Sequence, residues 1–267
     1  MLRLLVLVAA DQPPAYLATY FRWLTAPAGG RAVVLPLPTD LEPLSNPLRA
    51  SAALKEAFAG EPAGTAQVAD WPAGLPFMTA LQYLLEQHRA SAIVLGSPFT
   101  GQTMAAKVEL TPTLSILVRP PCPVLVMPLG KSFAGQPSRA VLAVSNGRAL
   151  VHPWIGATAR DLLRGWSPGI RLLQLSTLRC RAAVGEPACV WKTVLPEKSG
   201  LPPLEAQAAQ PGKRVEGLLA TAEHQQAGLL VLLLRARDQT HLPLTRRDTI
   251  HVALQAPVPT LLLPTLP

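Results

Sequence analysis

The chain repeats the same apolar segments in the same order about 136 residues apart, and this duplication limits the folds open to it. RLLVLVAA at residues 3–10 aligns with RAVLAVSN at 139–146, and CPVLVMP at 122–128 aligns with VPTLLLP at 258–264. Between them, ASAIVLG at 90–96 aligns with AGLLVLL at 227–233, at an offset of 137. Three matched segments in one order predict two copies of a structural unit of about 130 residues.

Each copy has the pattern of an α/β domain. Continuous apolar segments alternate with amphipathic ones, which predicts a parallel sheet covered by helices on both faces. The residues between the copies, 128–140, read PLGKSFAGQPSRA and are rich in the glycine, proline and serine typical of linkers. We therefore predict a first domain over residues 1–130, a linker over 131–137 and a second domain over 138–267.

The expected elements follow the same plan in both domains. The first domain should place strands near residues 3–9, 32–37, 65–69, 92–95 and 124–127, and helices near 14–25, 48–58, 76–88 and 112–118. The second should place strands near 140–145, 171–176, 190–195, 229–234 and 260–263, and helices near 153–164, 212–224 and 246–254. The proline-containing stretch 196–212 is interpreted as a long connection. Such doubly wound folds bind ligands beyond the carboxyl ends of their strands, here near the loops after the first and fourth.

Composition and motif content argue against several functional classes. No apolar run reaches the about 18–20 residues that a membrane-spanning helix needs. The three cysteines and five histidines show no metal-ligand spacing, and no nucleophile, base and acid form a catalytic set, so we expect neither a metal site nor an enzyme. Few, unclustered cysteines indicate a reduced, cytoplasmic protein, in which the proline-flanked Cys122 is expected to be inert.

Two motifs of the first copy resemble the universal stress protein family: ASAIVLGSPFTG at residues 90–101 and RPPCPVLVMP at 119–128. The apolar strand that opens each copy is similar to that family too, so the resemblance covers nearly the whole chain as two tandem domains. It implies an α/β fold in which each domain is doubly wound around a five-stranded parallel sheet of strand order 3-2-1-4-5. Some members of the family bind ATP, and others have lost that capacity.

The residues that bind ATP in this family are only partly present here. ATP-binding members carry an Asp after the first strand and a loop of Gly, two residues, Gly, nine residues, then Gly and Ser or Thr, which lets backbone N–H groups approach phosphate oxygens. In the first domain Gly96 matches the first glycine, whereas Ala9 stands at the Asp position, with Asp11 two residues beyond it, and Phe99 stands at the second glycine. The corresponding positions of the second domain hold Ser145, Leu233 and the pair Arg246–Arg247. The resemblance therefore predicts degraded nucleotide sites and no bound cofactor.

The resemblance implies a non-enzymatic, stress-linked binding or scaffold role, and two alternatives stay open. In one, the loop of the first domain keeps a weak site for ATP or another small ligand, built from Gly96, Ser97, Thr100, Gly101 and Thr111. In the other, the second domain, which carries most of the net charge of +8, binds an acidic ligand or nucleic acid, with Arg235, Arg237, Arg246 and Arg247 as the anion-binding candidates. No aromatic side chains are interleaved with these arginines, which argues against single-stranded nucleic acid and makes nucleic acid the less favoured partner.

The repeated endings predict an interface. The last strand of each domain should form an edge of its sheet, and exposed apolar edges invite pairing. Many members of the resembled family pair such strands between two subunits. Because this chain carries both copies, we expect an intramolecular pseudo-dimer in which residues 124–127 pair with 260–263, through Val124, Val126, Thr260 and Leu262. Pro123 and Pro259, which have no N–H to donate, are expected at the strand starts. A homodimer or another protein partner remains an open alternative.

Overall fold

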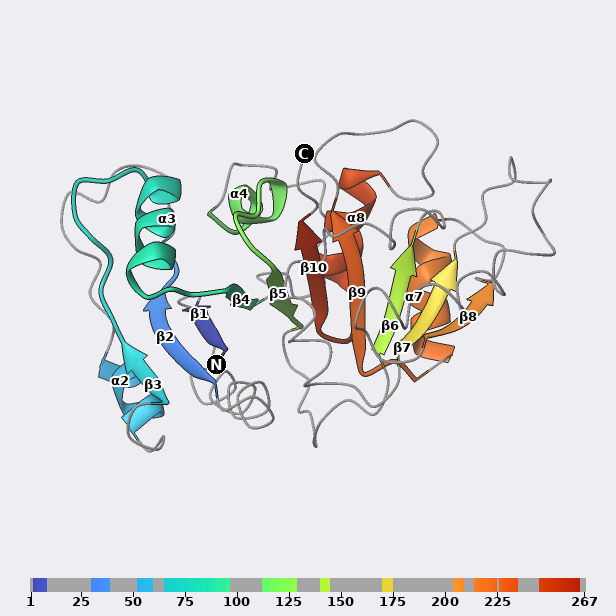
Figure 1. Ribbon diagram of the computed structural model, residues 1–267, viewed down its shortest axis with the longest axis horizontal. Coiled ribbons are helices and arrows are strands. Elements are labelled where there is room, and N and C mark those ends of the chain that lie inside the picture. Colours follow the sequence, from blue (N-terminus) through green and yellow to red (C-terminus); the bar gives the residue numbers. More distant parts are fainter. Residues whose placement is uncertain are drawn as a thin grey trace. The chain divides into compact units, whose positions relative to one another are not determined.

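The computed structural model describes residues 2–8, 30–38, 52–59, 65–96, 112–128, 140–144, 170–174, 204–208, 214–224, 226–234 and 245–264. The chain divides into two compact units, Met1–Ala134 (unit 1) and Gly135–Pro267 (unit 2). Each unit contains a parallel sheet with helices packed against it (Figure 1). The helices expected near residues 14–25 and 153–164 lie outside the described residues.

Unit 1 is a doubly wound α/β unit. Its strands are β1 (Arg3–Val8), β2 (Arg31–Pro36), β3 (Ala66–Val68), β4 (Ala92–Gly96) and β5 (Val124–Met127), and its described helices are α2 (Ala52–Ala59), α3 (Phe77–Gln87) and α4 (Pro112–Val118). All its strand pairs are parallel, and they give the order β3-β2-β1-β4-β5. The expected fold class and strand order are therefore confirmed for this unit.

Unit 2 repeats the same topology. Its strands are β6 (Ala140–Val144), β7 (Ile170–Gln174), β8 (Leu204–Ala208), β9 (Leu229–Leu234) and β10 (Thr260–Pro264), and its described helices are α7 (Arg214–His224) and α8 (Arg246–Gln255). The pairs are again parallel and give the order β8-β7-β6-β9-β10. In both units the first strand lies at the centre of the sheet and the last strand at one of its ends.

The third strand of unit 2 corrects the sequence-based expectation. That strand was expected near residues 190–195, which lie outside the described residues, and 196–212 was interpreted as a loop. The structure instead places β8 at Leu204–Ala208, inside that stretch, where it pairs with β7. Its sequence LEAQA alternates apolar and polar residues, as is typical of a strand with one solvated face. The expectation was wrong because it followed the apolar and β-branched residues of VWKTVL at 190–195 instead of the alternation in LEAQA.

The two units also share individual hydrogen bonds. Helices α3 and α7 end in the same turn, formed by residues 85–90 in unit 1 and 222–227 in unit 2. In both turns the sixth N–H donates to the first carbonyl, at 2.8 and 2.9 Å, and the fifth N–H donates to the second carbonyl, at 3.1 and 2.9 Å. This is the Schellman motif, and its left-handed position is filled by Arg89 (φ 51°) and Gln226 (φ 50°) rather than by glycine.

The last strands of both units begin after a proline, as expected. The carbonyl of Pro123, directly before β5, accepts the N–H of Ile93 at 2.9 Å, and the carbonyl of Pro259, directly before β10, accepts the N–H of Leu230 at 2.9 Å. Each proline thus contributes the carbonyl that accepts the first hydrogen bond between the last two strands. At this position the missing N–H of proline is not needed.

Candidate ligand site at the carboxyl ends of the strands

The switch point of unit 1 lies between β1 and β4. These two strands are neighbours in register, with Leu7 opposite Leu95, and they end at Val8 and at the buried Gly96. The chain therefore leaves the sheet from two adjacent strands at one edge, which is where ligands of doubly wound folds bind. Of the expected loop residues, the structure places Gly96 at this edge, whereas Ser97, Thr100, Gly101 and Thr111 lie outside the described residues.

Beside this switch point, backbone N–H groups of the chain donate to carbonyls at the carboxyl ends of β1 and β2. The N–H of Leu37 donates to the carbonyl of Val8 at 2.7 Å. The N–H of Ala69, which follows β3, donates to the carbonyl of Val34 at 2.9 Å. The backbone therefore satisfies these acceptors where the strands end. The next carbonyl on the same edge of β2 as that of Val34 belongs to Pro36, and a side chain donates to it instead.

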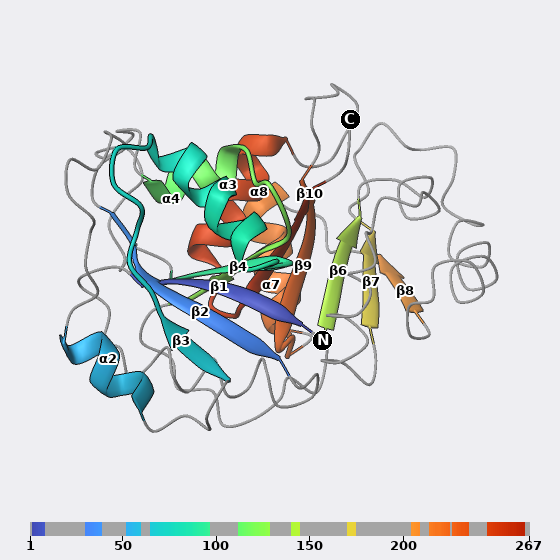
Figure 2. The same ribbon diagram turned by 60° about the vertical axis from the view of Figure 1, so that its left-hand side comes forward.

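Trp71 is that side chain, and the sequence analysis did not single it out. Its indole Nε1–H donates to the carbonyl of Pro36, the last residue of β2. The ring is 1% exposed and packs on Phe77, the first residue of α3, with centroids 5.3 Å apart and planes tilted by 42°. The connection from β3 to α3, drawn in cyan in Figure 2, thus carries an indole onto the carboxyl end of β2.

In unit 2, the helix that follows the fourth strand is capped by its own side chains. The Oγ1 of Thr245 accepts the N–H of Asp248 at 3.1 Å, and the Oδ2 of Asp248 accepts the N–H of Thr245 at 2.9 Å. This capping box makes Thr245 the N-cap of α8 and puts Arg246 and Arg247 in its first two helical positions. The spacing Thr-x-x-Asp at residues 245–248 is typical of such a cap, although the sequence had indicated Asp248 only as a charge that partly neutralises the neighbouring arginines.

The capping box bears on anion binding at this end of α8. The N-terminus of a helix attracts anions through backbone N–H groups that have no intrahelical partner. Here two of those groups already donate to Thr245 and Asp248, and the carboxylate of Asp248 adds negative charge at the same place. Arg247 is exposed and Arg246 is partly buried, whereas Arg235 and Arg237 lie outside the described residues. The helix end itself is therefore poorly suited to phosphate.

Replacing Asp248 with alanine should destabilise the protein by about 1 kcal/mol, because it removes one half of the capping box and a carboxylate that interacts favourably with the helix dipole. The matched control is Arg247→Ala, one residue away, which removes a cation from the same helix end and should leave stability unchanged or slightly higher. Urea denaturation of both variants measures the difference. Equal losses for the two variants would show that the capping box is not what stabilises α8.

The structure also bears on the metal, membrane and thiol expectations. Among the residues that the structure describes, no three His, Cys, Asp or Glu side chains gather as metal ligands would. Within the same residues, no helix combines the length and the apolar character that crossing a membrane requires. Burial raises the pKa of the Cys122 thiol to about 12, and its Sγ lies 3.6 Å from the carbonyl oxygen of Pro123. At neutral pH this thiol is protonated, which agrees with the expectation that it is inert.

The four residues expected at an interface belong to the last strand of each unit. Val124 and Val126 lie in β5, Thr260 and Leu262 lie in β10, and all four are buried. In the order of its own sheet, each of these strands has one neighbour, β4 for β5 and β9 for β10. That the two strands pair with each other stays a prediction.

Comparison with known proteins identifies the fold. No family model matches the chain, and no curated protein matches it. Among solved structures, a putative universal stress protein from Pseudomonas aeruginosa UCBPP-PA14 is similar with a TM-score of 0.66 at 16% identity, over 98% of this chain and 93% of that one. A universal stress protein from Archaeoglobus fulgidus DSM 4304 is similar with a TM-score of 0.64 at 17% identity, over 98% of this chain and 96% of that one. At these identities the likeness shows the fold, which is the one that the sequence motifs implied.

Proposed function

We propose that this chain is a non-enzymatic, stress-related protein with the fold of the universal stress proteins, in which neither unit retains a nucleotide site. Its role would be to bind or hold together other components under stress. The fold supports the relation to stress proteins. The observation that carries the loss of the nucleotide sites is the replacement, in both units, of the residues that would contact a nucleotide.

In unit 1 the proposal rests on two substitutions. Ala9 stands where ATP-binding proteins of this fold carry a carboxylate, so that no side-chain acceptor is available there for the ribose hydroxyls. Phe99 stands where a glycine would let the backbone approach a phosphate, and its side chain restricts that approach. The glycine that remains, Gly96, ends β4 as it would in a functional site, but one glycine does not make a phosphate loop.

In unit 2 the proposal rests on the end of α8. The backbone N–H groups of Thr245 and Asp248 are engaged in the capping box, so that a phosphate would have to displace a carboxylate from its hydrogen bond. Ser145 and Leu233 replace the Asp and the first glycine. We therefore assign no nucleotide to either unit. As a scaffold, the chain would join its two units through β5 and β10, forming a pseudo-dimer.

The proposal predicts that the purified protein does not bind ATP. Its melting temperature should stay within about 1 °C of the unliganded value at millimolar ATP and magnesium, because a ligand stabilises a protein only in proportion to its occupancy of the folded state. Isothermal titration calorimetry should show no heat of binding. The control is a variant with Thr100→Asp, which places a carboxylate in the loop after β4 and would repel phosphate. A shift of several degrees in the natural protein that disappears in this variant would show that the loop of unit 1 still binds nucleotide.

A further inference from the structure

We infer that Trp71 prevents ligands that carry a fused aromatic ring from binding at the carboxyl end of β2 in unit 1. The indole of Trp71 fills that position and donates to the carbonyl that such a ring would need as its hydrogen-bond acceptor. The inference rests on the proposed loss of nucleotide binding and adds a cause that the sequence motifs do not contain. It makes Trp71 a specificity-determining residue that excludes nucleobases and similar rings.

The first observation is the position of the indole on the sheet. One edge of β2 presents its carbonyls to β3, and on that edge the carbonyl of Val34 accepts the N–H of Ala69. β3 ends at Val68, so the next carbonyl on that edge, that of Pro36, has no strand beside it. The indole N–H of Trp71 donates to this carbonyl. A strand-end carbonyl beyond the last ladder bond is a natural acceptor for a ligand N–H at the edge where ligands of this fold bind, and here it is already engaged.

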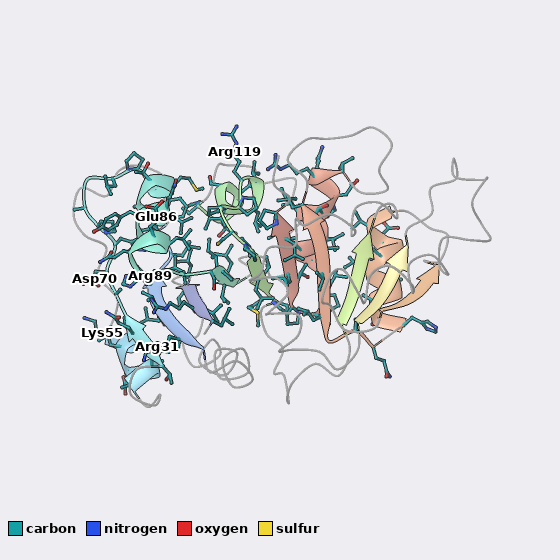
Figure 3. All side chains as sticks on the ribbon, in the orientation of Figure 1. Arg31, Lys55, Asp70, Glu86, Arg89 and Arg119 are labelled. Carbon is teal, nitrogen blue, oxygen red and sulfur yellow. The ribbon has the colours of Figure 1, made fainter. Side chains whose placement is uncertain are left out.

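The second observation is that the indole is fixed in place. Trp71 is 1% exposed and has Phe77 against its ring. The preceding residue, Asp70, which is labelled in Figure 3, is exposed, whereas Trp71 is buried. Pro72 follows directly, and Gly74 takes a positive φ of 76° that turns the connection towards α3. The indole is therefore held by its hydrogen bond, its ring contact and the turn that follows it.

The third consideration is size and chemistry. An indole and an adenine are both fused five- and six-membered rings, and each has an N–H donor: the ring N–H in indole and the exocyclic amino group in the adenine of adenosine. A purine that donated to the Pro36 carbonyl would need the volume that the indole now fills, and close-packed protein interiors do not hold both. On this inference, a ligand with a fused ring would have to bind beside the ends of β1 and β4, away from the end of β2.

The test is a gain of ring binding when the indole is removed. We would make Trp71→Ala and Trp71→Phe in the full chain, confirm folding by circular dichroism, and measure melting temperatures with indole, 1-methylindole and adenosine. Indole and adenosine should each raise the melting temperature of Trp71→Ala by about 3 °C at tenfold excess over the dissociation constant. 1-Methylindole should give a smaller shift, because it has no N–H for the Pro36 carbonyl. The natural protein and Trp71→Phe should respond to none of the three compounds.

Each outcome decides between the inference and a purely structural role. If Trp71→Ala is folded and binds indole but not adenosine, Trp71 is a core residue that leaves a cavity and the inference is wrong. Equal shifts of the melting temperature with indole and 1-methylindole would show that the Pro36 carbonyl takes no part in binding the ring, and would also overturn the inference. Should Trp71→Ala fail to fold, Trp71→Leu, which fills part of the volume, is measured with the same compounds and judged by the same criteria.

The proposed loss of nucleotide binding and this inference fail in different ways. ATP binding by the natural protein that inorganic tripolyphosphate displaces and adenosine does not would contradict the proposed function, while leaving the ring position closed as inferred. Adenosine binding by the natural protein would show that the ring position is open and would overturn the inference.

Discussion

Cys122 should react with iodoacetamide about a thousandfold more slowly in the folded protein than in the same protein unfolded in urea, at pH 8 and with Cys180 and Cys189 replaced by serine. Only the thiolate reacts, and burial raises the pKa of the Cys122 thiol to about 12. An unperturbed thiol has a pKa near 8.5, so the folded protein holds about a thousandfold less thiolate at this pH. Mass spectrometry of samples quenched over time gives both rates. Equal rates for the folded and the unfolded protein would show that the thiol is accessible and that folding does not raise its pKa.

The same raised pKa predicts how stability depends on pH. The folded state holds the proton of Cys122 more tightly than the unfolded state does, so the thiol's contribution to stability is complete below the unfolded pKa, near 8.5. That contribution is lost as the pH rises towards the folded pKa of about 12, by about 1.4 kcal/mol per pH unit at most. The control is Cys122→Ala, which has no thiol to titrate and should lose less stability between pH 8.5 and 10.5. Parallel pH profiles for the two proteins would contradict the assignment to Cys122.

Strands β4 and β5 were predictable because parallel strands that are buried on both faces have continuous apolar sequences. AIVLG at Ala92–Gly96 and VLVM at Val124–Met127 are buried at every position, and the sequence analysis placed both within one residue of their observed ends. The edge strand β8 was not found, because Leu204–Ala208 alternates apolar and polar residues inside a stretch that also contains prolines and glycines. Continuous apolar runs reveal strands that are buried on both faces, whereas a strand such as β8 has to be found from the alternation of its residues.

The candidate site was predictable only where one local motif specifies the geometry. Gly96 lies at the end of β4, as the motif ASAIVLG implied, and Thr245 with Asp248 forms a cap that the spacing of these two residues would have revealed. The role of Trp71 could not be read locally. Its partner Pro36 lies 35 residues earlier in the chain, and the two meet only because β2 and β3 are neighbours in the sheet. Such a contact depends on strand order, which no single motif contains.

The proposed pairing of the last strands predicts an intramolecular disulfide in a monomeric protein. The variant has all three native cysteines replaced by serine and carries Val126→Cys together with either Thr260→Cys or Leu262→Cys. Opposite residues of paired antiparallel strands have Cα atoms about 4.5–5.5 Å apart, which is within the range of a disulfide. Under mild oxidation, one of the two combinations should cross-link nearly completely. Non-reducing electrophoresis distinguishes the cross-linked monomer from a disulfide-linked dimer.

Within each unit, the last strand of the sheet is paired along one edge. β5 has β4 as its one neighbour in the sheet of unit 1, and β10 has only β9 in the sheet of unit 2, so each strand has a second edge whose N–H and C=O groups need a partner. The side chains of Val126 and Leu262 are apolar and buried, without the lysines or inward charges that protect a free edge. A matched control pairs Leu262→Cys with Tyr83→Cys, on the exposed surface of α3, and should give no cross-link. Cross-links that appear only between chains, and increase with protein concentration, would mean that these strands pair two molecules instead of the two units of one.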